Sequence, residues 1–164
     1  MRNKKALSAI VSVVIIIGLT IAAGAIVFTV VRNLASDKLN DAQSCLKSIE
    51  KFEINGAYTC YNSTGQEIQI SISRKELGID YLMIVISSGE ESRTFKLYDE
   101  AQVIEGVVNY PSRTTSIVLP GNESGKTYII DWNLGIPEKI QITPSINKKI
   151  CNIVDEINTI QSCI

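Results

Sequence analysis

Histidine is absent from the 164 residues, and this absence removes several kinds of chemistry. Without imidazole the chain has no Ser–His or Cys–His nucleophile pair, and it lacks the commonest protein ligand for transition metals. No acidic cluster has the spacing of a calcium loop, and no glycine-rich phosphate loop occurs. Basic residues do not form a patch with interleaved aromatics, which disfavours nucleic-acid binding. The sequence therefore predicts a protein that is not an enzyme and that needs no metal or other cofactor.

The chain also lacks any Cys-x-x-Cys pair, although it has four cysteines: Cys45, Cys60, Cys151 and Cys163. An even number of cysteines outside a membrane segment predicts two disulfides in an oxidising compartment, whereas four free thiols would indicate a reducing one. Three pairings are possible. We favour Cys45–Cys60, which would join the outer end of a helix to the first strand, and Cys151–Cys163, which would close the tail. Loops of this size would contribute about 3 kcal/mol each.

Charge is missing from the whole segment Leu7 to Val31. Arg2, Lys4 and Lys5 precede this segment, and the first acidic residue is Asp37. A helix needs about 20 apolar residues to cross a bilayer, so residues 7–31 are long enough to span one. Basic residues before the span predict that its start stays on the cytoplasmic side and that the rest of the chain is exported.

Three interpretations of this segment compete: a secretory signal, a permanent anchor, and a leader that is cut before the helix. A secretory signal has an apolar region of about 7 to 15 residues followed by a small-x-small site. Ala23-Gly24-Ala25 has that form, but the apolar run continues beyond it through residues 26–31. This continuation disfavours the discarded signal and leaves the anchor and the leader.

The entrance to the segment distinguishes the remaining two interpretations. It reads Arg2-Asn3-Lys4-Lys5-Ala6-Leu7-Ser8-Ala9-Ile10-Val11. A short basic leader, a small residue and an unbroken apolar helix resemble the class III signal of archaeal type IV pilins and archaellins, over residues 2–32. In that family a prepilin peptidase cuts between the small residue and the helix. The resemblance implies a leader of residues 1–6, a cut at Ala6–Leu7, and recognition through Lys4, Lys5 and Ser8. Val11 replaces the Glu of bacterial pilins, as in archaeal ones.

Small residues recur on one side of this helix. Gly18, Ala22, Ala25 and Thr29 follow the spacing i, i+4, i+7 and i+11, which places them on one face and permits close helix–helix packing. Beyond the span, an amphipathic stripe predicts that the helix continues and lies against an exported head. The stripe consists of Ala35, Leu39, Ala42, Leu46 and Ile49. We expect one helix over residues 7–50, with residues 7–31 as the transmembrane segment or filament core.

From residue 51 the apolar pattern changes to a period of two, which indicates strands. Strands are expected at residues 67–73, 81–86, 94–98, 102–108, 114–119, 126–132 and 138–143. Their number and spacing predict an α+β protein in which the long helix is followed by an antiparallel, immunoglobulin-like β-sandwich over residues 51–164. The apolar spacing at 150–160 predicts a short helix in the tail. Two glycosylation sequons start at Asn62 and Asn122, both in expected turns.

The resemblance implies a structural subunit. A prepilin would enter the cytoplasmic membrane, be cut at Ala6–Leu7, and be extracted by an assembly platform protein and an ATPase. It would then polymerise with copies of itself into an extracellular surface filament, with adhesion as the expected role. Motility and DNA uptake stay open, as does the choice between a major and a minor pilin. The alternative is an uncleaved single-span protein whose exported β-domain binds a ligand or partner.

Overall fold

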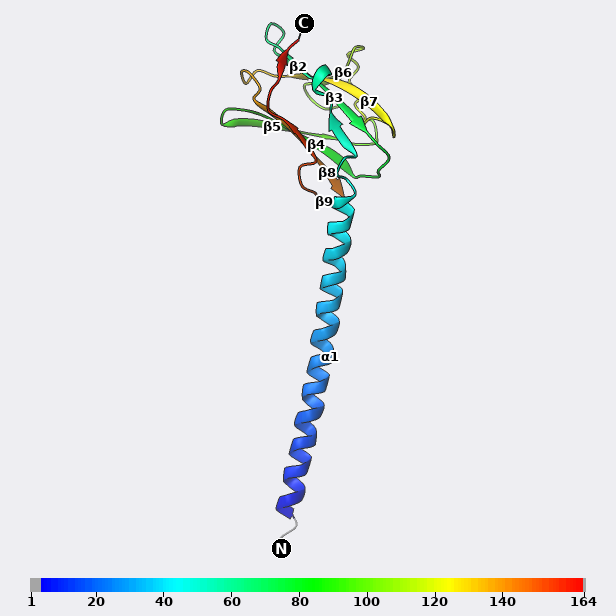
Figure 1. The fold of residues 1–164 in the computed structure, drawn as a ribbon, viewed down its shortest axis with the longest axis vertical. Helices are drawn as coiled ribbons and strands as arrows, with labels where there is room; N and C mark the ends of the chain where they lie inside the picture. The colour runs from blue at the N-terminus through cyan, green and yellow to red at the C-terminus, as the bar shows by residue number, and fades with distance from the viewer. Residues whose placement is uncertain (1–3, 164) are drawn as a thin grey trace. The chain divides into compact units, whose positions relative to one another are not determined.

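The computed structural model describes residues 4–163; for residues 4–10, 37, 38 and 40–42 it describes the course of the backbone alone. The chain divides into two units, residues 1–42 and 43–164. The first consists of most of the helix α1 (Lys4–Leu46). The second holds the last turn of α1 and all the strands (Figure 1). A long apolar helix followed by β-sheets is the α+β layout that the sequence predicts.

The helix α1 contains no proline and no break. It ends at Leu46, a few residues before the expected boundary near residue 50, and residues 47–51 form turns. Ser48 is fully buried, and its hydroxyl donates to the Cys45 carbonyl at 2.6 Å. Glu50 has a positive φ of 64°. The chain therefore leaves the helix through a tight turn rather than through a flexible linker.

The strands form two sheets. In the first sheet the order is β11-β2-β3-β7-β6, with β1 also paired to β3; in the second it is β10-β8-β4-β5, with β9 also paired to β8. All neighbours are antiparallel except β11 and β2. The strands of the first sheet are β1 (Phe52–Ile54), β2 (Cys60–Asn62), β3 (Glu67–Arg74), β6 (Val107–Asn109), β7 (Ser124–Asp131) and β11 (Gln161–Ser162). Those of the second are β4 (Tyr81–Ser88), β5 (Glu91–Leu97), β8 (Lys139–Ile146), β9 (Lys149–Ile150) and β10 (Asp155–Ile157).

One hydrophobic core joins the two sheets. Alternate residues of β3 and β4 point into it, as the period of two requires, and Trp132 at the end of β7 is fully buried there. The indole N–H of Trp132 donates to the Gly135 carbonyl at 2.8 Å, so its polar group is satisfied. The buried strand residues are Ile68, Ile70 and Ile72 from β3, Leu82, Ile84 and Ile86 from β4, and Ile140 and Ile142 from β8.

Two of the expected strands are mostly loops. Residues 102–108 and 114–119 are joined by the single bridge Gln102–Ile117, and of these segments only Val107 and Val108 belong to a strand, β6, which pairs with β7. Turns replace a continuous ladder of backbone hydrogen bonds in this region. The Tyr128 hydroxyl also donates to the Val118 carbonyl, at 2.7 Å. The remaining expected strands correspond to β3, β4, β5, β7 and β8.

The predicted tail helix is wrong. Residues 149–162 are extended, and they add β9 and β10 to the second sheet and β11 to the first. The Asp155 carboxylate also accepts the Ile54 N–H at 2.7 Å, which ties the tail to β1. Open strand edges and this side-chain bond satisfy the backbone of the tail better than an isolated helical turn would.

The favoured disulfide pairing is also wrong. All four cysteines form disulfides, but as Cys45–Cys151 and Cys60–Cys163, each between residues more than 100 positions apart. The cause is the extended tail, which runs from the end of α1 to the far edge of the first sheet and places one cysteine at each end of its path. The Cα atoms of the two pairs lie 5.3 and 5.0 Å apart.

Candidate functional site: an uncovered apolar helix

The apolar part of α1 is the most unusual surface of the protein. All residues from Val11 to Ser36 are exposed in the single chain, and this segment is long and apolar enough to cross a membrane. Its large apolar side chains are each at least half exposed. They are Val11, Val13, Val14, Ile15, Ile16, Ile17, Leu19, Ile21, Ile26, Val27, Phe28, Val30, Val31 and Leu34.

The free energy of covering these apolar side chains is large enough that the segment does not stay in water. Burying one such side chain fully is worth about 1.5 to 3 kcal/mol, so covering the exposed half of these fourteen is worth on the order of 10 to 20 kcal/mol. A typical domain is stable by only about 5 to 15 kcal/mol. The segment therefore requires an apolar environment, which is either lipid or other protein.

The two threonines inside the segment are compatible with such an environment. The Thr29 hydroxyl donates to the Ala25 carbonyl at 2.8 Å, and the Thr20 hydroxyl donates to the Ile17 carbonyl at 2.8 Å. Both hydroxyls are thus satisfied within the helix, so burial costs them no hydrogen bond.

The four small residues of the predicted packing face are exposed in the single chain. At 100° per residue, Gly18, Ala22, Ala25 and Thr29 lie within about 60° of arc. A Cβ added at Gly18 would meet nothing within 4 Å, and the same holds for Gly24. Glycine in a helix costs about 1 kcal/mol relative to alanine. Packing within one chain gives no reason for this cost, so any steric reason lies in a neighbouring molecule.

The expected cleavage residues lie at the start of α1. The Ala6–Leu7 bond is in its first turns, with Lys4, Lys5 and Ser8 beside it; the side chains of these five residues lie outside the described part. Met1, Arg2 and Asn3, the rest of the expected leader, lie outside the described residues altogether.

The opposite end of α1 is fixed to the β-unit. Cys45, in the last turn, is bonded to Cys151 in the tail. Around this disulfide, four apolar side chains remain half exposed or more: Leu46, Ile49, Ile150 and Ile153. Leu46 and Ile49 end the predicted amphipathic stripe, and both are exposed, so the prediction that the stripe packs against the head is wrong for these two residues.

The two sequons differ in their surroundings. Asn122 is exposed in a turn before β7. Asn62 ends β2 and is only partly exposed, and its side-chain carbonyl accepts the N–H groups of Thr64 and Gly65, both at 3.1 Å. Attachment of a glycan is therefore sterically easier at Asn122.

The titratable groups perform structural tasks. Burial raises the pKa of the Tyr128 hydroxyl, which keeps it a neutral donor to Val118. Arg113 forms two hydrogen bonds with Glu67, at 2.9 and 2.8 Å, and this pairing raises the pKa of its guanidinium. Among the side chains that the structure describes, no three Asp, Glu or Cys residues are grouped so that they could hold a metal ion.

No protein-family model, curated protein or solved structure matches this chain. The interpretation of its function therefore depends on its own residues and geometry.

Proposed function

We propose that the protein is a structural subunit of a surface filament similar to archaeal type IV pili. In this proposal a prepilin peptidase cuts the Ala6–Leu7 bond, and the apolar part of α1 then moves from lipid into the core of the filament. Copies of the chain replace lipid as the apolar environment, and the β-units form the outer surface. Adhesion is the role that we propose for this surface.

One observation carries the proposal. The apolar helix continues without a loop to Leu46, and a disulfide joins its last turn to the chain's tail. A protein that is only tethered to a membrane needs no such join, because a flexible linker serves it equally well. A filament subunit does need it, because force on the surface must pass through every β-unit into the core.

The strand order supports an immunoglobulin-like head. The sequence β2-β3-β7-β6 corresponds to A-B-E-D of an immunoglobulin sandwich, and β10-β8-β4-β5 corresponds to G-F-C-C′. Such a sandwich with two long-range disulfides resists unfolding outside the cell, as a filament surface requires.

A first test compares two neighbouring alanines. Ala22 belongs to the small-residue face, whereas Ala23 lies about 100° away around the helix. We expect Ala22→Leu to abolish filaments in electron micrographs of cells, because the larger side chain separates the helices. The matched control Ala23→Leu, which changes hydropathy equally, should retain them, and both variants should reach the membrane in equal amounts.

Intact mass tests the cleavage step separately. Native protein should begin at Leu7, and the variant Ala6→Trp should accumulate with its leader. Two results together would instead identify a membrane-anchored binding module. The native chain would still carry Lys4 and Lys5, and the variants Ala22→Leu and Ala23→Leu would be equally abundant and equally monomeric.

A further inference from the structure

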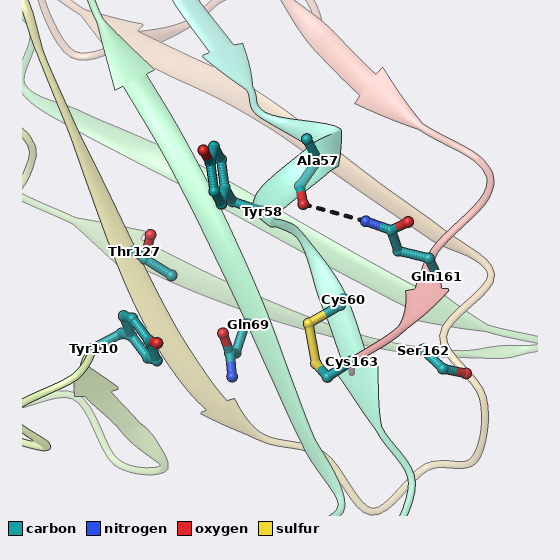
Figure 2. A pocket seen from close by; sticks show the side chains of 9 residues that line it. All are labelled: Ala57, Tyr58, Cys60, Gln69, Tyr110, Thr127, Gln161, Ser162 and Cys163. Carbon is teal, nitrogen blue, oxygen red and sulfur yellow. Dashed lines mark hydrogen bonds between the residues drawn. A yellow bond between two sulfur atoms is a disulfide. The ribbon is translucent and has the colours of Figure 1, made fainter.

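A small groove lies on the outer face of the first sheet, beside the Cys60–Cys163 disulfide (Figure 2). Gln69 of β3 and Thr127 of β7 contribute to its lining, and both lie on the face of the sheet that points away from the core. Its volume is about 230 Å³. Pockets for drug-sized ligands begin at about 300 Å³, so this groove suits a single small ring.

Two tyrosines border the groove. Tyr58 is the last residue of the short 3-10 helix η1 (Gly56–Tyr58), and Tyr110 follows β6 (Val107–Asn109) directly. The two residues are 67% and 50% exposed. Figure 2 shows Thr127 between the two rings and Gln69 between Tyr110 and the disulfide. The groove therefore combines exposed aromatic faces with a polar floor.

The polar groups of this floor are unpartnered. Within the described part of the chain, the side chains of Gln69 and Thr127 form no hydrogen bond, and neither do the hydroxyls of Tyr58 and Tyr110. An amide offers two donors and an acceptor, and a hydroxyl offers a donor and acceptors. Together they can exchange several hydrogen bonds with a ligand that is rich in hydroxyl groups.

The walls of the groove are held in place before any ligand binds. The Gln161 amide donates to the carbonyls of Gly56 and Ala57 at 3.2 and 3.3 Å, which fixes β11 to η1. The Cys60–Cys163 disulfide fixes the same strand to β2. On the other side, the Tyr110 N–H donates to the Thr127 carbonyl at 3.0 Å. Such preorganisation reduces the entropy that binding costs.

The groove contains no charged side chain. A second cleft on the same sheet, near Lys51, Arg74 and Glu123, is by contrast lined by charges of both signs. A ligand of the groove should therefore be neutral, because a charged ligand would lose water without gaining a counter-ion.

We propose that this groove binds a neutral sugar ring. The apolar C–H face of the ring stacks on Tyr58 or Tyr110, and its hydroxyls exchange hydrogen bonds with Gln69 and Thr127. This inference concerns the β-unit alone and goes beyond the proposed filament. Two sources offer the same chemistry: a glycan on a sequon of a neighbouring copy, or a polysaccharide on another surface.

The test is saturation-transfer NMR with the full chain in a detergent that contains no sugar, such as lauryldimethylamine oxide. The probes are glucose, galactose, mannose and N-acetylglucosamine, with glucuronate as the charged comparison. We expect ring protons of at least one neutral sugar to receive saturation. At least one of the variants Tyr58→Ala and Tyr110→Ala should weaken binding by about tenfold, since a stacked aromatic ring contributes that much.

Controls separate binding from folding. Thr127→Val keeps the shape and strand preference of the residue but removes its hydroxyl, and it should also weaken binding. Ile136→Ala changes a side chain that is 72% exposed and that does not line the groove; the Ile136 carbonyl accepts from Ser88 of the second sheet. This variant should leave binding unchanged. No signal from any neutral sugar, a stronger signal from glucuronate, or equal signals from wild type and both tyrosine variants would overturn the proposal.

The variant Asn62→Gln/Asn122→Gln, purified from a glycosylating host, distinguishes the two sources. If its filaments bind added sugar more strongly than wild-type filaments do, the wild-type groove is occupied by a neighbour's glycan. If both bind equally, the groove faces an external polysaccharide. Either result supports the proposed site, and absence of binding in both forms refutes it.

Discussion

Removal of one disulfide should lower the free energy of unfolding by an amount that depends on how the two disulfides are connected. Cys45–Cys151 and Cys60–Cys163 are interleaved in sequence, with separations of 106 and 103 residues. If each acted alone, closing a loop of about 100 residues would stabilise the fold by about 4.7 kcal/mol through the entropy of the unfolded chain.

The interleaving lowers the cost of a single removal. With Cys45–Cys151 intact, the shortest covalent path from Cys60 to Cys163 falls from 103 residues to about 27. The same relation then gives about 3.6 kcal/mol for Cys60→Ala/Cys163→Ala, and the same value for Cys45→Ala/Cys151→Ala. Loss of both disulfides should cost about 8 kcal/mol, which exceeds the sum of the single losses by about 1 kcal/mol.

Urea unfolding followed by Trp132 fluorescence measures these costs, because this single tryptophan is fully buried in the core. The four proteins needed are the wild type, the two paired Cys→Ala variants and the variant without cysteines. Short, separate loops would give a different result: each single removal would lower the free energy of unfolding by about 3 kcal/mol, and the two losses would add up to the loss in the variant without cysteines. That result would refute the interleaved connectivity. Recovery of a peptide linked through Cys45–Cys60 from a non-reduced digest would refute it equally.

Three further outcomes are expected. Ile84→Ala, in the centre of β4, should reduce the free energy of unfolding by about 2 to 5 kcal/mol in the same urea assay, because it leaves a cavity among fully buried side chains. Glycopeptide mass spectrometry should find higher occupancy at Asn122 than at Asn62, since the Asn62 side chain is engaged by its own turn; equal occupancy would contradict this. The Gln141 amide holds the pKa of the Glu156 carboxyl below its ordinary value of 4.5, so Gln141→Leu should raise that pKa in an NMR titration. The pKa of Glu156 is lower in the folded than in the unfolded protein. The hydrogen bond between Gln141 and Glu156 therefore stabilises the fold above the unfolded pKa, and this stabilisation is lost as the pH falls through the folded pKa.

The parts of the fold that local pattern determines were predictable from sequence. The uncharged run to Val31 predicts the helix, and the alternation at Ile68, Ile70 and Ile72 predicts β3 with its correct faces. In these elements the apolar residues repeat with the period of the structure that they form, and tertiary contacts reinforce the preference.

The tail shows where local pattern fails. Ile150, Ile153, Val154, Ile157 and Ile160 have helical spacing, yet the segment is extended. Of these, Ile150 and Ile153 are at least half exposed, whereas the other three pack against the core from extended backbone. What fixes the tail is distant in sequence: two sheet edges and two cysteine partners.

The groove was missed for the same reason. Tyr58, Gln69, Tyr110 and Thr127 belong to four separate segments, and each alone looks like an ordinary residue of a strand or turn. Only the pairing of β2, β3 and β7 brings them to one face of the sheet.

The most direct test of the proposed function is electron cryomicroscopy of filaments sheared from cells that produce this chain. The proposed function predicts helical filaments in which density for each subunit begins at Leu7, residues 7–31 of neighbouring copies pack together along the axis, and Gly18 faces another helix. Preparations in which the protein occurs only as separate membrane-embedded molecules that retain residues 1–6 would contradict it.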